Sequence, residues 1–202
     1  MDIQTSDDRD RAGENFLVTR FSRDIFSRSR IGGMFINKQA SSGGDFNRTM
    51  ALDASFAFGP ALTINSFFAK TASPGVSEGQ LGYHGRVAWT DKDWNLWLQY
   101  TDIEDDFNAE VGFVPRVGIR TTNFHIGPTP RPKRLNIRVL RPMINVTYTT
   151  DQTNRLLSRR VHYMLGTEME DGTFINVVYN RLFEQLDAPF PIQPGIEIPQ
   201  DR

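Results

Sequence analysis

The sequence predicts an all-β protein: an antiparallel meander of about ten amphipathic strands. Three observations lead to this fold class. Apolar and polar residues alternate with a period of two in stretch after stretch. No comparable stretch carries an apolar stripe of helical period with capping residues, so few helices are expected. Short turns rich in Gly and Asp also alternate with longer polar loops along most of the chain.

The individual strands follow from this alternation. The clearest is 49–58, where Met50, Leu52 and Phe56 share one face and Thr49 and Asp53 the other. The same pattern runs through 81–90, 94–101 and 175–180. Matching the whole chain to the pattern places strands near 14–23, 30–38, 47–58, 61–71, 81–90, 94–103, 117–126, 134–149, 155–170 and 173–184.

The connections favour one kind of β-protein. Tight turns are predicted at 58–61, 91–93 and 170–173, and longer polar loops at 39–46, 72–80, 104–116 and 149–154. Such alternation is typical of outer-membrane barrels, which have short periplasmic turns and longer external loops. The Pro-rich segment 127–133 does not fit, because a short turn is expected there. The interpretation is a partial or complete outer-membrane-type β-barrel.

Composition narrows the function classes. A net charge of −1 gives no global field for nucleic acid, and the absence of cysteine excludes disulfides and thiolate metal sites. No apolar window is long enough for a transmembrane helix, whereas a spanning strand needs only about 9–11 residues. Tryptophan beside turns, as at Trp89 and Trp94, is typical of a membrane interface. A soluble β-sandwich or lipocalin-like binder explains the same aromatics by cross-strand pairing and stays an alternative.

Several runs of the chain resemble one known family. The run DDFNAEVGFV, from Asp105 to Val114, is similar to the DNFNPEVGFV signature of the DUF5916 family of bacterial proteins. NFLVTRFSRDIFSRSRIGGMFINK (15–38), ALDASFAF, INSFFAKTASPG and LFEQLDAPFPIQPGIEIP also match in order, so the resemblance covers most of the chain. Ala109 departs from the family, which often has Pro there. The signature loop comprises Asp105, Asp106, Phe107, Asn108, Glu110, Gly112 and Phe113.

The resemblance implies an organisation and a location. Family members are typically large exported proteins with an N-terminal family 9 carbohydrate-binding domain and a C-terminal region resembling an outer-membrane β-barrel. This chain matches part of that C-terminal region only. We therefore expect 1–13 to be a disordered or truncated lead-in, 14–186 a barrel segment, and 187–202 a Pro-rich loop or truncated end. The implied partners are outer-membrane lipid and a carbohydrate ligand bound through the missing domain.

Charged residues within the predicted strands indicate an inward face. An arginine facing lipid at mid-membrane costs about 2–4 kcal/mol, so strand arginines should point into the lumen or lie near a rim. Inside, they would pair with Asp53 or Glu168. The histidines lack metal-ligand spacing. The lumen-facing candidates are Arg20, Asp53, His84, Arg86, Arg138 and Arg160.

The densest carboxylate cluster lies at 102–110. It could bind Ca²⁺ or supply the paired carboxylates of a glycosidase, but it lacks EF-hand spacing, and turn capping explains its Asp and Asn residues more simply. No nucleophile, nucleotide or zinc-protease motif occurs. The sequence predicts a non-catalytic outer-membrane barrel segment for binding or passage of carbohydrate or another nutrient. The rival hypothesis is part of an exported glycan hydrolase.

Overall fold

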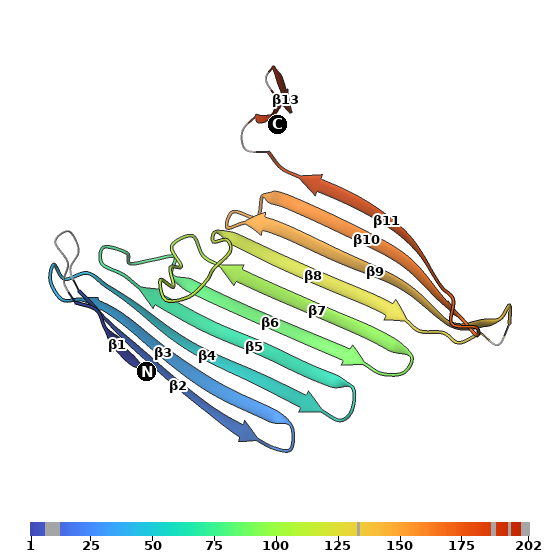
Figure 1. The fold of residues 1–202 in the computed structure, drawn as a ribbon, viewed down its shortest axis with the longest axis horizontal. Helices are drawn as coiled ribbons and strands as arrows, with labels where there is room; N and C mark the ends of the chain where they lie inside the picture. The colour runs from blue at the N-terminus through green and yellow to red at the C-terminus, as the bar shows by residue number, and fades with distance from the viewer. Residues whose placement is uncertain (7–12, 133, 187–188, 194, 199–202) are drawn as a thin grey trace. The chain divides into compact units, whose positions relative to one another are not determined.

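The chain forms antiparallel β-strands joined in the order in which they occur. The computed structural model describes residues 1–6, 13–132, 134–186, 189–193 and 195–198. Eleven strands make one sheet whose spatial order is the chain order, β1 to β11, and β12 and β13 make a separate two-stranded sheet (Figure 1). The strands are β1 (Asp2–Gln4), β2 (Glu14–Ile25), β3 (Ser29–Ala40), β4 (Phe46–Phe58), β5 (Leu62–Ala72), β6 (Leu81–Thr90), β7 (Trp94–Ile103), β8 (Ile119–Pro128), β9 (Ile137–Asp151), β10 (Leu156–Met169), β11 (Phe174–Glu184), β12 (Phe190–Gln193) and β13 (Ile196–Ile198).

The predicted all-β meander is confirmed. All ten predicted strands are present, with bounds that differ from the expected ones by a few residues. The short strands β1, β12 and β13 were not predicted, because three or four residues are too few to show a period of two. Across the part of the chain that the structure describes, no helix is long and apolar enough to cross a membrane.

The chain divides into two compact units. Unit 1 comprises 1–88 and 99–119, and unit 2 comprises 89–98 and 120–202. We call the strand ends joined by 41–45, 73–80, 104–118 and 152–155 the loop end, and those joined by 26–28, 59–61, 91–93, 129–136 and 170–173 the turn end. In unit 1 the loop-end connections are five, eight and fifteen residues long and the turns three, as predicted.

In unit 2 the connection lengths do not alternate as expected. The predicted long loop at 149–154 shortens to 152–155, because β9 continues to Asp151, whose carboxylate accepts hydrogen bonds from the Thr153 and Arg155 N–H groups. The Pro-rich segment gives an eight-residue connection at 129–136. Loop alternation is therefore a property of unit 1 alone.

Strand register separates the side chains of unit 1 into two faces. The apolar face carries large apolar side chains that are mostly exposed; Met50 is 61% exposed and Leu52 66%. Its members on β2 to β5 include Leu17, Phe21, Ile31, Phe35, Met50, Leu52, Phe56, Phe58, Leu62, Ile64 and Phe68. The polar face includes Glu14, Arg20, Lys38, Asn47, Thr49, Asp53, Asn65 and Thr71.

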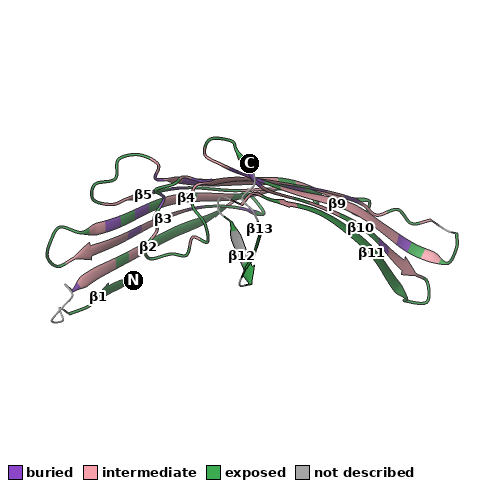
Figure 2. Cartoon of the chain, turned by 90° about the horizontal axis from the view of Figure 1, so that it is seen from above, coloured by how far each residue is buried: buried purple, intermediate pink, exposed green. Residues whose placement is uncertain are grey.

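Unit 2 has the same two faces. On β9 to β11 the register puts Leu140, Pro142, Ile144, Val146, Tyr148, Val161, Tyr163, Leu165, Ile175, Val177 and Tyr179 on the apolar face. It puts Arg141, Asn145, Thr147, Thr149, Arg160, His162, Asn176 and Asn180 on the polar face. All but one residue of β11 is exposed, which Figure 2 shows as a nearly continuous green strand.

The pattern of burial in this fold differs from that of a water-soluble domain. Among the described residues, the largest side chains that are fully buried are Asn47, Thr71 and Asp102, all of them polar. Large apolar side chains are instead exposed along the apolar face. In a soluble protein Ile, Leu and Phe are among the residues most often buried, and large contiguous apolar patches on the surface are rare.

Candidate functional site

The β7–β8 connection lies on the polar face of unit 1. Its central aromatic residue, Phe107, is buried and packs in one cluster with Ala69 of β5 and Ile103 of β7. A side chain at Gly82 would crowd this packing, since a Cβ there would lie 3.1 Å from Phe107 Cε2 and the ring would have to shift. Small residues on the strands thus make room for a large residue of the loop.

Hydrogen bonds from two buried polar residues fix the loop backbone. Asn47, which is 0% exposed, donates through Nδ2 to the Asn108 carbonyl (2.8 Å) and accepts at Oδ1 from the Glu110 N–H (3.3 Å). The Asn108 N–H donates to Thr71 Oγ1 (3.1 Å). These bonds satisfy polar groups that would otherwise be buried without partners. Loop and strands therefore form one hydrogen-bonded unit.

An ion triad holds the loop at its acidic residue. Lys38 Nζ lies 2.8 Å from a carboxylate oxygen of Glu110 and 2.8 Å from one of Glu14. All three side chains are only partly exposed. Glu110, one of the carboxylates considered for catalysis, is thus engaged in attaching the loop to β3.

Two further residues of the acidic cluster, Asp102 and Glu104, have separate partners. Asp102, which is 1% exposed, accepts hydrogen bonds from the hydroxyls of Tyr83 (2.8 Å) and Tyr100 (3.2 Å). Glu104 accepts from the Leu81 N–H (2.7 Å). Among the described residues, no three His, Asp or Glu side chains gather as a metal site would require. Binding of Ca²⁺ at 102–110 stays a prediction.

A cavity of about 550 Å³ lies between the signature loop and the strands of unit 1. Its walls include Met34, Ile36, Phe67 and Val114, with Arg20 and Asp53 among the polar groups. The volume is within the usual range for small-molecule pockets, which are mostly apolar with a few polar groups. Phe113, 89% exposed, also lines it.

Two of the four strand arginines, Arg20 and Arg138, form the expected ion pairs with Asp53 and Glu168. Arg20 Nη1 lies 2.5 Å from Asp53 Oδ2 across the polar face of unit 1. Gly32, between them, leaves room for the pair, because a Cβ at Gly32 would lie 2.7 Å from Arg20 Nη2. In unit 2, Glu168 pairs with Arg141 (2.9 Å) and Arg138 (3.3 Å). Arg138 lies at a shift in the β9–β10 register, where a bulge re-aims a side chain.

The remaining lumen-facing candidates also lie on the polar faces. His84 stacks on Phe67, with ring centroids 5.6 Å apart, and its Nδ1 lies 2.9 Å from Thr101 Oγ1. Arg86, two residues further along β6, shares this face. Arg160 and His162 are polar-face residues of β10, and His162 Nδ1 lies 2.7 Å from Asn180 Oδ1.

One feature of the polar face in unit 2 was not predicted. Trp97 of β7 and His125 of β8 stack almost parallel, with centroids 5.3 Å apart and an interplanar angle of 3°. The two rings lie beside hydroxyl and amide groups that hydrogen-bond across β8 and β9, such as Asn123 with Thr147. The sequence signal was the position of Trp97, which shares the polar face of its strand with Asn95, Gln99 and Thr101.

No known relative helps to assign this site. The chain matches none of the protein families, curated proteins or solved structures with which it was compared. The features that bear on its function are the two faces, the loop packed on the polar face and the stacked rings.

Proposed function

We propose that this chain forms part of a bacterial outer-membrane β-barrel, non-catalytic and of the DUF5916 type, with lipid against its apolar faces. The observation that carries the proposal is the pattern of burial: large apolar side chains are exposed on the apolar face, while the polar residues Asn47 and Thr71 are buried on the polar face. A bilayer provides an apolar medium for the former, and a barrel interior is polar.

The dimensions of the apolar face support this assignment. On β4 the apolar face runs from Met50 to Phe58, which is nine residues. A strand that spans a bilayer needs about 9–11 residues. Trp89 and Trp94 lie at the turn end and Tyr148 near the loop end, as expected of aromatic girdles at the two interfaces.

The polar faces support binding or passage of carbohydrate or another polar nutrient. They offer hydroxyl and amide groups, which can donate or accept hydrogen bonds, beside the flat rings of the His84–Phe67 and Trp97–His125 stacks. The loop attached by Phe107 and Asn47 covers part of the polar face of unit 1 and would limit access to it. A carbohydrate-binding domain outside this chain would deliver the solute.

The glycan-hydrolase alternative gains no specific support from the site. Among the carboxylates, Glu110 pairs with Lys38 and Asp102 accepts bonds from two tyrosines. Both are engaged within the protein, and Lys38 also neutralises Glu14, the carboxylate beside Glu110. Glycoside hydrolysis instead uses two carboxyl groups that flank the scissile bond.

A matched pair of arginine substitutions on β4 tests the membrane assignment. Leu52→Arg puts a charge on the apolar face and should weaken insertion by about 2–4 kcal/mol, whereas Ser55→Arg, on the polar face of the same strand, should have little effect. The measurement is flotation of the refolded chain with phosphatidylcholine vesicles, with circular dichroism to check folding. A wild-type chain that stays in the aqueous fraction, or equal flotation of both variants, would refute the proposal.

A further inference from the structure

Most charges on the apolar faces are cationic. On the strands of unit 1 this face has three cations, Arg23, Arg48 and Lys70, and two acidic residues. Asp2 of β1 lies opposite Leu17, and Asp102 is buried and hydrogen-bonded to two tyrosines. On β8 to β11 of unit 2 it has Arg120, Arg159 and Arg181 and no acidic residue among those described. The polar faces, in contrast, have both signs in ion pairs.

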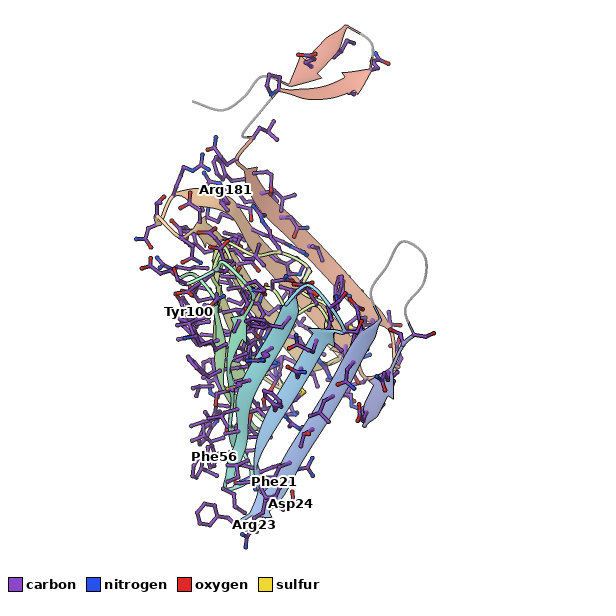
Figure 3. All side chains as sticks on the ribbon, turned by 90° about the vertical axis from the view of Figure 1, so that its left-hand side faces the viewer. Phe21, Arg23, Asp24, Phe56, Tyr100 and Arg181 are labelled. Carbon is purple, nitrogen blue, oxygen red and sulfur yellow. The ribbon has the colours of Figure 1, made fainter. Side chains whose placement is uncertain are left out.

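Five of these six cations lie at the loop end of their strands. Arg48 and Arg120 come near the starts of β4 and β8, Lys70 near the end of β5, and Arg159 near the start of β10. Arg181 lies toward the loop-end side of β11 (Figure 3). Only Arg23, also labelled in Figure 3, lies at the turn end. Within each unit, most of these cations therefore lie at one border of the apolar face.

In each unit two of the cations are diagonal neighbours on adjacent strands. Arg48 is opposite Ala72 and Met50 is opposite Lys70, so Arg48 and Lys70 are offset by two residues on one face. Arg159 is opposite Phe183 and Val161 is opposite Arg181, which gives the same offset in unit 2. Diagonal neighbours in a sheet are about 7–8 Å apart. Each pair thus brings two positive charges close together.

Neither pair is neutralised by the protein. In the described part of the chain, none of Arg48, Lys70, Arg159 and Arg181 forms an ion pair; Arg48 donates to the neutral Asn37 Oδ1 and lies over the Phe46 ring. Two like charges at this separation repel each other, and an anion between them would remove the repulsion. An anion that borders an apolar face in a membrane is a lipid phosphate.

We propose that the loop end of the apolar faces binds phosphate headgroups of membrane lipids, through one diagonal cation pair in each unit: Arg48 with Lys70, and Arg159 with Arg181. Guanidinium groups bind phosphate with paired, charge-assisted hydrogen bonds. The acyl chains of the same lipid would lie on the apolar side chains beside the pair. This inference rests on the proposed membrane location and adds a lipid class and a leaflet, the one on the loop-end side.

The test compares a phosphorylated lipid with the same lipid lacking phosphate. The full chain, folded in non-ionic detergent micelles, is mixed with dioleoyl phosphatidic acid or dioleoylglycerol, and retained lipid is measured by native mass spectrometry. A cation near a membrane surface contributes about fivefold in affinity for anionic lipid. Arg159→Gln with Arg181→Gln should therefore weaken the unit 2 site for phosphatidic acid by roughly 25-fold, so that the chain retains one phosphatidic acid molecule where the unchanged chain retains two. Retention of dioleoylglycerol should be unchanged.

Arg23→Gln is the matched control, because Arg23 has the same charge and face but the opposite end. It should retain phosphatidic acid as the unchanged chain does. If the unit 2 double variant does not fold, Arg48→Gln with Lys70→Gln tests the unit 1 pair in the same way. Equal losses in the control and the double variant, or no loss in either, would overturn the inference.

Flotation with neutral phosphatidylcholine vesicles separates this inference from the proposed function. A chain that does not float with these vesicles overturns both, because it has no membrane location. A chain that floats but shows no preference for phosphatidic acid over dioleoylglycerol overturns only the headgroup site.

Discussion

At the scale of single residues, the turns depend on aspartate carboxylates. Asp91 Oδ1 accepts from the N–H groups of Asp93 and Trp94, both at 2.8 Å, and Oδ2 accepts from the Trp89 indole, also at 2.8 Å. Asp171 accepts from the Thr173 N–H in the β10–β11 turn. Such side-chain bonds to the backbone are what make Asp common in turns. Folding therefore stabilises the charged forms of Asp91 and Asp171.

This geometry predicts an acid-sensitive β6–β7 turn. Hydrogen bonds from the Asp93 N–H, then the Trp89 indole and the Trp94 N–H, lower the pKa of Asp91 below its ordinary value of 3.8. Because the folded pKa is depressed, the carboxylate stabilises the turn at all pH values above the ordinary pKa. That contribution should be lost as the pH falls through the folded pKa.

Hydrogen exchange measures the effect locally. We expect the amides of Asp93 and Trp94 to lose protection in the acid range, and Asp91→Asn, which keeps an acceptor oxygen but cannot titrate, to lack this step. Asp171→Asn, at a different turn, is the control and should leave the acid step at 93–94 in place. An identical acid response in the Asp91→Asn chain would contradict the assignment.

At the scale of elements, the strands were predictable and the signature loop was not. Ten strands could be placed because each is long enough for apolar and polar residues to alternate several times, as Met50 to Phe58 do. The loop was expected to be solvated because of its carboxylates. Its Phe107 is instead buried, and its backbone bonds to Asn47 and Thr71, which lie far away in the sequence.

The signal for this packing was weak but present. Gly82 and Ala51 are small residues on the polar face, and the loop packs against them. Phe107 is the aromatic residue in the middle of an otherwise acidic run. Period-two patterns assign a face to each strand residue and say nothing about which loop covers that face. Pairing of Arg20 with Asp53 could be predicted, since both charges had to avoid the apolar face.

The two phenylalanines of the loop give a matched test of its attachment. Phe107→Ala should destabilise unit 1 by about 3 kcal/mol, because a buried aromatic contact is lost and a cavity remains. Phe113→Ala, 89% exposed in the same loop, should have an effect within about 0.5 kcal/mol. The measurements are urea unfolding in detergent and limited proteolysis within 104–118. Cleavage of the loop at the same rate in both variants would show that Phe107 does not hold it.

At the scale of the whole molecule, exposed apolar faces should control refolding. Diluting the urea-unfolded chain into non-ionic detergent micelles should give a β-sheet circular dichroism spectrum and a dispersed species, because the micelle covers side chains such as Leu52 and Val177. Dilution into buffer alone should give light-scattering aggregates. A dispersed, folded monomer in buffer would contradict this prediction.

The strict alternation of residues also affects when the chain acquires an affinity for apolar surroundings. Each strand alternates apolar and polar residues, and the mean hydropathy of the whole chain is −0.43. The extended polypeptide therefore has no continuous apolar surface. Only when neighbouring strands pair do their apolar residues join into a continuous face. The continuous apolar surface is thus created by hydrogen bonding between strands. At the proposed membrane location, entry into the bilayer and formation of the sheet would be a single event.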